Sequence, residues 1–303
     1  MRILFIAHRF PFPPTFGSRV RAFNVIRHLG KAHALTVLSP VRSAAEAREA
    51  EGLAPYCASF ETFRVCNWVQ AAKIAASLPT SRTASEAFFH SAPMQQRIKS
   101  LLASRRFDFV FAHCSAVGRY FEDIERPPGL IDYCDVDSRK WRDYARNRRW
   151  PLSVGYWWEA VRLEAAERRL ARSFEGVTVA TRGEVAALSA LGITRNVDWF
   201  PNGVDLDYFA PSTQPHDPDL ITFVGRMDYF PNVQCMAGFC AQVMPMLRLR
   251  RPGLRLQIVG AAPTREVREL ARLPGVTVTG AVPDVRPYVT RSALTVAPLR
   301  IAL

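Results

Sequence analysis

The loop Pro11–Arg21 combines a turn-forming glycine with two arginines, a composition suited to binding an anion or a sugar. Gly17 lies at the turn, and Arg19 and Arg21 follow it. Backbone N–H groups at a helix start favour phosphate or a sugar hydroxyl, and arginine adds charge-assisted hydrogen bonds. The loop lacks the G-x-G-x-x-G dinucleotide fingerprint, so an ordinary turn between a strand and a helix is the alternative interpretation.

Two further loops, Val224–Asn232 and Val259–Pro263, follow predicted strands in the second half of the chain. Gly225 ends the first of these strands, and Arg226 stands where a diphosphate would bind, because a guanidinium offers a planar fork of hydrogen-bond donors. In the other loop, Gly260 and its small neighbours would let the backbone approach a base or ribose closely. The alternatives are a solvated arginine and a tight strand–helix connection.

A histidine and three aspartates end two neighbouring predicted strands of the first half. His113 could act as a general base or hold a sugar hydroxyl, although a structural role is the alternative. Asp132, Asp135 and Asp137 could bind sugar hydroxyls or a metal ion. Asp137 or Ser138 could instead cap the helix that follows.

Short apolar segments alternate with longer helical patterns, which indicates strand–helix units and parallel sheets. The segment 201–217 is rich in Pro, Asn, Asp and Gly and predicts a linker. We therefore expect an α/β protein with two Rossmann-like domains, residues 1–200 and 218–303, the second with only four strands and incomplete. The predicted strands are Arg2–Ala7, Ala34–Leu38, Phe60–Val65, Phe107–Ala112, Leu130–Tyr133, Val177–Ala180, Val197–Phe200, Ile221–Val224, Arg255–Val259, Val276–Thr279 and Leu294–Ala297. The predicted helices include Gly17–Leu29, Met94–Leu102, Trp158–Ser173, Val233–Leu249 and Arg265–Arg272.

The composition is that of a globular protein, with 49% hydrophobic residues and a net charge of +13 over 303 residues. A basic surface suits anionic lipid, phosphorylated substrates or nucleic acid, or it reflects a bias towards arginine. Basic residues do not alternate with aromatics as in a nucleic-acid platform. The six cysteines have no C-x-x-C spacing, which disfavours a zinc site.

The N-terminus has no signal peptide, and no segment reaches the roughly 20 apolar residues of a spanning helix. We therefore expect a cytoplasmic protein, with peripheral binding to the inner face of the cell membrane as an option. Trp141, Trp150, Trp157 and Trp158 lie in Arg-rich sequence. They predict either a membrane-facing surface or part of the core.

Several segments together resemble the retaining GT-B glycosyltransferases of family four, the group 1 glycosyl transferases. They follow in the family's order: PNGVD at 201–205, FVGRMDYFPN at 223–232, LQIVGAAP at 256–263, VTVTGAVPDVRPYV at 276–289 and VAPLR at 296–300. The first half matches in layout, through FPFPPTFGSRVRAFNVIRHL at 10–29. IDYCDVDSRKW at 131–141 is similar to the sugar transferases of exosortase/PEP-CTERM exopolysaccharide systems.

The resemblance implies a GT-B-like fold, with the acceptor bound by the N-terminal domain and a nucleotide sugar by the C-terminal domain. Arg226 would neutralise the donor diphosphate. Many family members carry a lysine five or six residues further on, where this chain has Pro231 and Asn232. The residues and the resemblance together predict a site with His113 as the catalytic residue, with Gly17, Gly225, Arg226, Asn232 and Gly260 on the donor side, and with Arg19, Arg21 and Asp135 on the acceptor side.

The implied reaction transfers a sugar from a nucleotide diphosphate sugar to a hydroxyl of a saccharide or lipid-linked acceptor, with retention of anomeric configuration. It uses no metal and no further cofactor, so the Asp135-Val136-Asp137 triplet is interpreted as a chance match to D-x-D. The family's E-x7-E carboxylates follow a segment like APLRIAL and are absent. We therefore expect the 303-residue chain alone to be inactive.

Three other functions remain open. A Rossmann oxidoreductase or nucleotide-sugar epimerase is disfavoured because neither domain has the dinucleotide fingerprint. A non-catalytic module that binds a nucleotide or a glycan is the alternative from a different class. A binder of lipid surfaces or nucleic acid rests on charge alone, and we expect no nucleic-acid partner.

Overall fold

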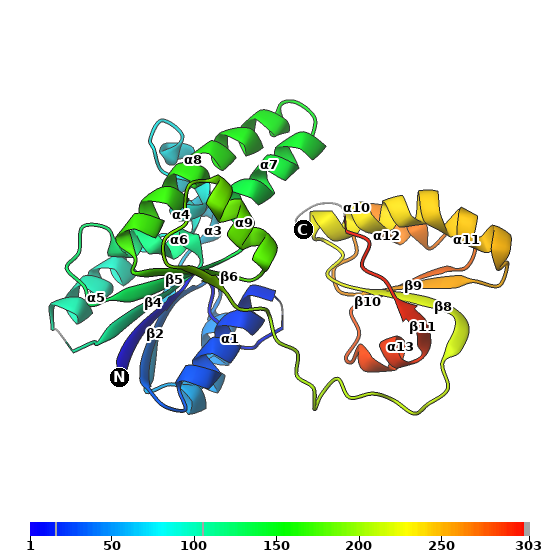
Figure 1. The fold of residues 1–303 in the computed structure, drawn as a ribbon, viewed down its shortest axis with the longest axis horizontal. Coiled ribbons are helices and arrows are strands. Elements are labelled where there is room, and N and C mark those ends of the chain that lie inside the picture. Colours follow the sequence, from blue (N-terminus) through cyan, green and yellow to red (C-terminus); the bar gives the residue numbers. More distant parts are fainter. Residues whose placement is uncertain (16, 105, 300–303) are drawn as a thin grey trace. The chain divides into compact units, whose positions relative to one another are not determined.

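The computed structural model describes residues 1–15, 17–104 and 106–299. It divides into two compact units, Met1–Gly203 and Val204–Leu303 (Figure 1). Each unit has its own parallel sheet and its own hydrophobic core.

The first unit is built on a seven-stranded parallel sheet with the order β3-β2-β1-β4-β5-β6-β7. β1 pairs with β2 on one side and with β4 on the other, so the strand order reverses between β1 and β4. The strands are β1 (Arg2–Ala7), β2 (Ala34–Val41), β3 (Ser59–Arg64), β4 (Phe109–His113), β5 (Gly129–Cys134), β6 (Gly176–Val179) and β7 (Val197–Trp199). All eleven strands predicted along the chain are present, with bounds that shift by up to four residues.

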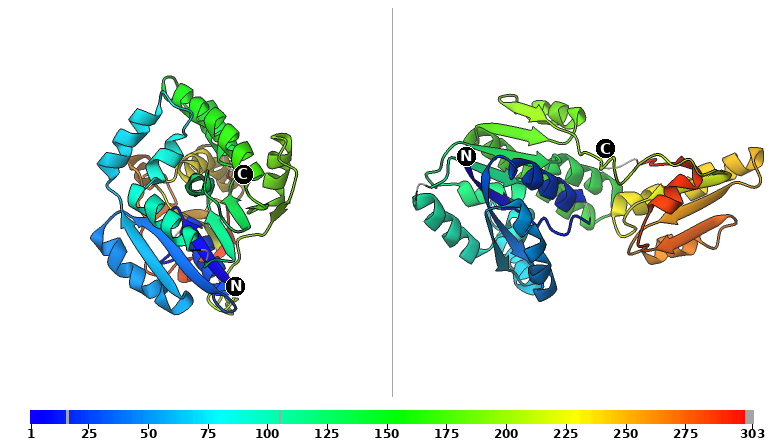
Figure 2. Two further views of the ribbon diagram at one scale, coloured as in Figure 1. Left: turned by 90° about the vertical axis from the view of Figure 1, so that its left-hand side faces the viewer. Right: turned by 90° about the horizontal axis from the view of Figure 1, so that it is seen from below.

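Helices cover both faces of this sheet (Figure 2). One face packs against α1 and η1, and the other against α5, α6, α8 and α9. The helices are α1 (Gly17–Leu29), α2 (Ala44–Glu49), η1 (Ala50–Tyr56), α3 (Asn67–Ser77), α4 (Ala84–Phe89), α5 (Ala92–Ala103), α6 (Ser115–Gly118), η2 (Arg119–Phe121), α7 (Asp137–Asn147), α8 (Leu152–Ser173) and α9 (Arg182–Ala190).

Strand β1 shows why the sheet is central to the unit. Ile3 and Phe5 pack on the face covered by α1, and Leu4 and Ile6 pack on the opposite face. A strand buried on both faces is a continuous apolar run rather than an alternating one. This is why the segment was recognisable from its sequence.

The second unit has a four-stranded parallel sheet with the order β10-β9-β8-β11. Its core lies between the sheet and the helices α10 to α12, while α13 lies on the other face (Figure 1). The elements are β8 (Asp217–Val224), α10 (Phe230–Gly238), a π-helical turn η3 (Phe239–Val243), α11 (Met244–Arg250), β9 (Arg255–Val259), α12 (Arg265–Leu270), β10 (Val276–Gly280), α13 (Arg286–Thr290) and β11 (Ser292–Thr295).

The helix predicted over Val233–Leu249 differs from the observed one in its middle. It begins three residues earlier and contains the π-helical turn η3. Pro245 lies in the first turn after η3 and has no N–H to continue the α-helical ladder. π-Helical turns occur mostly as single-turn bulges of this kind inside α-helices.

The two loops that follow β8 and β9 are in direct backbone contact. A Cβ atom on Gly260 would lie 1.7 Å from the carbonyl oxygen of Gly225, so no side chain fits there. Gly225 N–H donates to the Val259 carbonyl at 3.0 Å, and Met227 N–H donates to the Ala261 carbonyl at 2.9 Å. Gly260 therefore lets the two loops close onto each other.

We predict that Gly260→Ala destabilises the second unit by about 1–3 kcal/mol or more, because overpacking forces the backbone apart. Gly238→Ala is the matched control, since a Cβ there meets nothing within 4 Å and alanine favours a helix by up to about 1 kcal/mol. Urea unfolding of both variants measures the difference. Equal stability would show that the loops separate without cost.

Candidate functional site

The carboxyl ends of β1, β4 and β5 gather polar side chains at the point where the strand order reverses. Open parallel sheets bind ligands at such an edge. His8 follows β1, His113 ends β4, and Asp132 lies near the end of β5. Cys114 directly follows β4 and Cys134 is the last residue of β5, and they have positive φ angles of 83° and 64°. Such backbone conformations are uncommon for residues other than glycine, so both strands end in strained turns.

Asp132 is the centre of a buried hydrogen-bond network. Its carboxylate is fully buried and accepts two hydrogen bonds from Arg21 on α1, from Nε at 2.8 Å and from Nη2 at 2.9 Å. His113 Nδ1 lies 3.2 Å from the same carboxylate, and Thr178 Oγ1 on β6 donates to it at 3.1 Å. The network ties one helix to three strands.

Arg21 also holds the segment that leaves the sheet after β7. Its Nη1 donates to the Phe200 carbonyl at 2.9 Å and to Asn202 Oδ1 at 3.0 Å. Its guanidinium lies over the Phe200 ring, 3.8 Å from the centroid. The predicted acceptor contact of Arg21 would therefore compete with hydrogen bonds inside the domain.

Burial by itself would raise the pKa of Asp132, but the hydrogen bonds from His113 and Arg21 hold it well below its usual range. The carboxylate therefore stays ionised in the folded protein. The Asp132 carboxylate stabilises the fold fully at pH values above the pKa that it has in the unfolded chain. This stabilisation is lost as the pH falls towards its lower pKa in the folded protein.

Both ring nitrogens of His113 face hydrogen-bond acceptors. Nδ1 faces Asp132, and Nε2 lies 3.2 Å from the backbone carbonyl of Ser18 in the first turn of α1. The side chain is 1% exposed. To act as a general base on a substrate, the ring would first have to give up its contact with Ser18.

His113, Asp132 and Cys134 place one possible metal ligand each within 4.8 Å of one another. The carboxylate between them is already saturated, however, because Arg21 binds both of its oxygens. A guanidinium occupies the place that a cation would take. The arrangement is therefore that of a buried ion pair rather than a metal centre.

Asp137 is bound by its own neighbours on α6 and α7. Ser115 Oγ donates to it at 3.0 Å, and Lys140 forms an ion pair with it. Lys140 Nζ also lies 3.9 Å from the more exposed Asp135. The lysine thus partly neutralises both carboxylates of the D-x-D triplet.

The start of α7 corrects the expectation that Asp137 or Ser138 caps this helix. The residue at the cap position is Val136, which has no capping side chain. Glu167 of α8 accepts the N–H of Ser138 at 3.0 Å and its hydroxyl as well, and Glu184 accepts the N–H of Val136 at 3.0 Å. Long-range carboxylates thus replace the local cap, and burial raises the pKa of Glu167 to about 8.

The loop before α1 leads to two further predicted site residues at the start of that helix, Gly17 for the donor side and Arg19 for the acceptor side. Gly17 is the first residue of α1, and a Cβ added to it would meet nothing within 4 Å. Arg19 forms an ion pair with Glu46 of α2. These residues lie at the sheet edge where a ligand is expected, and their binding roles stay predictions.

His8 belongs to this edge but was not singled out from the sequence. Its residue is 8% exposed, its ring centroid lies 5.8 Å from that of His113, and its Nδ1 has no hydrogen-bond partner among the described residues. Burial, followed by the charges of His113 and Arg9, keeps its pKa well below the usual value. Its place directly after β1 was the available signal.

In the second unit, the loop after β8 presents Arg226 on the surface. Its side chain is 51% exposed and forms a two-pronged ion pair with Asp228, at 2.9 and 2.5 Å. Asn232, in the first turn of α10, donates to the Arg226 carbonyl at 2.9 Å. The loop is thus held in shape by Asn232, while the guanidinium lies at the carboxyl edge of the sheet.

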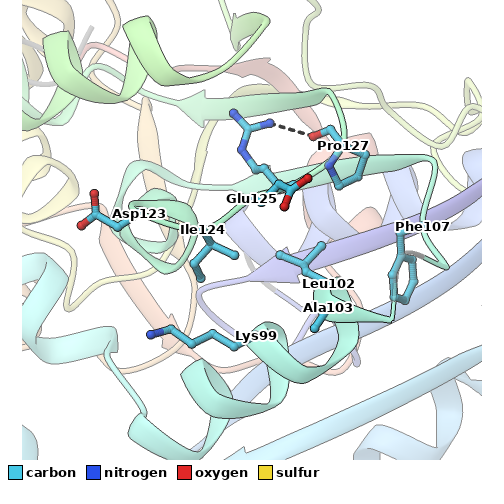
Figure 3. A pocket seen from close by; sticks show the side chains of 9 residues that line it. Lys99, Leu102, Ala103, Phe107, Asp123, Ile124, Glu125 and Pro127 are labelled. Atoms are coloured by element: carbon cyan, nitrogen blue, oxygen red, sulfur yellow. Dashed lines mark hydrogen bonds between the residues drawn. The ribbon is translucent and has the colours of Figure 1, made fainter.

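A pocket of about 670 Å³ lies at the opposite edge of the first sheet, near the amino ends of β4 and β5 (Figure 3). Lys99, Asp123 and Glu125 contribute charged groups, and Leu102 and Phe107 contribute apolar ones. None of the predicted site residues lines it. Because parallel sheets bind ligands at their carboxyl ends, we do not assign the candidate site to this pocket.

We predict that Arg21→Gln lowers the stability of the first unit by about 3–5 kcal/mol, because it leaves a buried carboxylate without its cation. Arg27→Gln, at an exposed position of the same helix, should change stability by less than about 0.5 kcal/mol. Denaturant unfolding followed by tryptophan fluorescence measures both. A small effect at Arg21 would mean that water or another group replaces the guanidinium.

We also predict that Glu167 makes the protein less stable as the pH rises. Its unfolded pKa is about 4.3, so the folded protein binds an extra proton between that pH and about 8, and stability falls across this window. Glu167→Gln should flatten the dependence of Tm on pH between 5 and 8. Glu164→Gln, on the same helix and paired with Arg142 and Arg168, should leave that fall in place. Parallel curves for the wild type and Glu167→Gln would contradict the assignment.

Comparison with known proteins connects this geometry to a family. The sequence profile described as "Glycosyl transferases group 1" matches residues 218–302. No curated protein matches the chain in sequence. None of the helices in the described part of the chain combines the length and apolar character needed to cross a bilayer.

Solved structures of glycosyltransferases superimpose on nearly the whole chain. Sucrose-phosphate synthase from Thermosynechococcus elongatus aligns with 100% of this chain and 77% of its own, with a TM-score of 0.66 and 15% identity. S. aureus TarM in complex with Fondaparinux, alpha-GlcNAc-glycerol and UDP aligns with 97% of this chain and 80% of its own, with a TM-score of 0.61 and 7% identity. An E. coli structure described as "Trehalose-6-phosphate from E. coli bound with UDP-2-fluoro glucose" aligns with 100% of this chain and 79% of its own, with a TM-score of 0.57 and 12% identity. The chain therefore has a GT-B fold of two Rossmann-like domains with parallel sheets, and its residues 218–302 match the model of the group 1 glycosyl transferases.

Proposed function

We propose that this protein is a glycosyltransferase that moves a sugar from a nucleotide diphosphate sugar to an acceptor hydroxyl, with retention of anomeric configuration. The observation that carries the proposal is the group 1 glycosyl transferase domain within a chain of GT-B fold. Two of the similar structures contain UDP or a UDP-sugar analogue. These ligands support a nucleotide diphosphate sugar as the donor.

The second unit is the proposed donor side. Arg226 lies on the loop that follows β8, and the loop after β9 is held against it by the contact of Gly225 with Gly260. In glycosyl transfer the leaving diphosphate gains negative charge, and a cationic side chain stabilises it more in the transition state than in the ground state. Arg226 would do this by exchanging its ion pair with Asp228 for one with phosphate.

Pro231 and Asn232 stand where the resemblance leads us to expect a second cation. Pro231 has no N–H, so it also removes a donor from the first turn of α10. Asn232 acts on the proposed donor site through the Arg226 carbonyl and is therefore a positioning residue. The proposed phosphate contact thus depends mainly on Arg226.

The carboxyl edge of the first unit is the proposed acceptor side. Arg19 in the first turn of α1 and Asp135 in the turn after β5 are proposed acceptor contacts, and His113 at the end of β4 is the proposed catalytic residue. His113 is kept in one orientation by Asp132 and Ser18. The acceptor class we propose is a saccharide or lipid-linked saccharide of cell-surface polysaccharide synthesis, as the resemblance of residues 131–141 suggests, with no metal or further cofactor.

Donor binding tests this proposal most directly. We predict that Arg226→Ala weakens binding of UDP or GDP by about tenfold to a hundredfold, since a charge-assisted hydrogen bond contributes about 1.5–3 kcal/mol. Arg265→Ala is the matched control, because Arg265 is an exposed arginine of the same unit with an ion pair of its own, to Glu269. Titration calorimetry with each nucleotide measures both variants. Equal affinities in the two variants would remove Arg226 from the donor site.

The activity itself is tested by transfer from radiolabelled UDP- and GDP-sugars to an extract of membrane glycolipids. Label in the glycolipid, reduced in Arg226→Ala, supports the proposal. Nucleotide binding without transfer fits both the inactivity expected of the 303-residue chain alone and the non-catalytic binding module. No affinity for any nucleotide or nucleotide sugar would overturn the proposed function.

A further inference from the structure

The hairpin of α7 and α8 carries an exposed apolar stripe that nothing in the first unit covers. Trp157 and Trp158 are 50% and 47% exposed, and Val154 and Val161 are exposed beside them. At the connection between the two helices, Trp150 is 80% exposed, and Leu152 is exposed as well. Contiguous exposed apolar surface of this kind marks an interaction site rather than ordinary variation.

The stripe lies on the side of α8 that is opposite its buried side. With about 100° of rotation per residue, residues 154, 157, 158, 161 and 165 fall within one arc of about 100°. The buried residues of α8 fall within the opposite arc: Glu159, Ala160, Leu163, Ala166, Glu167 and Leu170. The first part of the helix, up to residue 165, thus has a second apolar face, which its packing in the domain does not explain.

The hairpin is a firm support for this stripe. α7 and α8 lie side by side and project from the sheet (Figure 1). Trp141 and Tyr144 of α7 pack against Tyr156 of α8, with ring centroids 5.3 and 5.9 Å apart, and Arg142 pairs with Glu164. These contacts use Trp141 inside the hairpin, whereas the other three tryptophans of the segment face outward.

The surroundings of the stripe are basic. Arg146, which pairs with Asp143, and Arg148 and Arg149 are exposed just before Trp150, and residues 144–158 contain no acidic side chain. Arg162 lies 4.9 Å from the Trp158 ring centroid and binds the backbone carbonyls of Ser77 and Arg82 beside the exposed Leu78.

The acidic residues nearest the stripe are turned inward or neutralised. Glu159 accepts the N–H groups of Ala84 and Ser85 from within the fold. Glu164 pairs with Arg142 and Arg168. The stripe therefore presents apolar side chains within a rim of positive charge.

We propose that the outer face of the α7–α8 hairpin docks on the surface of an anionic lipid bilayer. Tryptophans place their rings at the boundary between headgroups and acyl chains, and an amphipathic helix with arginines beside its apolar face lies in that interface. The arginines face the phosphates of the headgroup layer. This surface is distinct from the proposed donor and acceptor sites and does not depend on the proposed activity.

A second copy of the chain fits this surface less well than lipid does. A symmetric dimer would pair the patch with itself. Arg146, Arg148 and Arg149 would then face a second set of the same arginines, and like charges across an interface are unfavourable. Anionic lipid satisfies the apolar stripe and the basic rim at once.

The direct test is co-sedimentation of the full 303-residue chain with vesicles. We predict binding to vesicles of phosphatidylcholine with one quarter phosphatidylglycerol at low salt, binding at least about tenfold weaker to pure phosphatidylcholine, and partial release at high salt. Brominated acyl chains should quench the tryptophan emission of the bound protein. Quenching requires no variant, so it tests insertion even if a substituted protein fails to fold.

Paired variants locate the surface. Trp157→Ser with Trp158→Ser, and Arg148→Glu with Arg149→Glu, should each weaken binding at least about tenfold. Met246→Ser with Leu249→Ser, and Arg250→Glu with Arg272→Glu, make the same kinds of change at exposed positions of the second unit. These controls should change binding less than about threefold. Circular dichroism checks that each variant is folded.

Several outcomes would overturn the proposal. These are no sedimentation with anionic vesicles at low salt, equal loss in the hairpin variants and their controls, or bound protein whose tryptophans are not quenched. A dimer in sedimentation velocity that dissociates in the Trp157→Ser/Trp158→Ser variant would assign the stripe to a second copy instead. Sugar transfer that persists without lipid binding would reject this inference and leave the proposed function intact.

Discussion

A single buried carboxylate constrains the whole first unit. Asp132 lies near the end of β5 with no exposure to solvent, and an ionised carboxylate in such a place is tolerated only when a cation and hydrogen bonds compensate it. Arg21 supplies the cation from α1, and His113 and Thr178 supply hydrogen bonds from β4 and β6. Arg21 thereby ties α1 to β5 and, through Phe200 and Asn202, to the segment after β7.

The second unit organises its sheet edge in a different way. Its two central loops are joined by backbone, through the contact of Gly225 with Gly260, and the charged group there, Arg226, stays at the surface. The sheet edge of the first unit is therefore held by a buried ion pair. The sheet edge of the second unit is held by backbone contacts and carries an ion pair at its surface, between Arg226 and Asp228. An exposed ion pair contributes little to stability, so Arg226 can exchange its partner at small cost.

The sequence was a good guide to elements and a poor guide to side-chain partners. Strands such as β1 were predictable because burial on both faces leaves an unbroken apolar run. The pairing of Arg21 with Asp132 was not, because the two residues are 111 positions apart and an arginine beside a glycine turn resembles a ligand-binding residue. The prediction of the α7 cap was wrong for the same reason, because the group that binds the Ser138 N–H is Glu167, 29 positions away. The binding and catalytic roles remain predictions, because a ligand contact leaves no periodic pattern in a sequence.

The separation of Arg21 from Asp132 has a consequence for how the protein is made. During synthesis α1 leaves the ribosome long before β5. Arg21 therefore has no Asp132 to bind until more than a hundred further residues have been made. Contacts between residues so far apart in sequence form late and slow the folding of a chain. Until β5 arrives, the half-built sheet shows unpaired edges of the kind that chaperones protect. The ion pair that fixes the finished domain thus cannot form until β5 has been made, and a nascent chain halted before Asp132 should remain a client of the folding machinery.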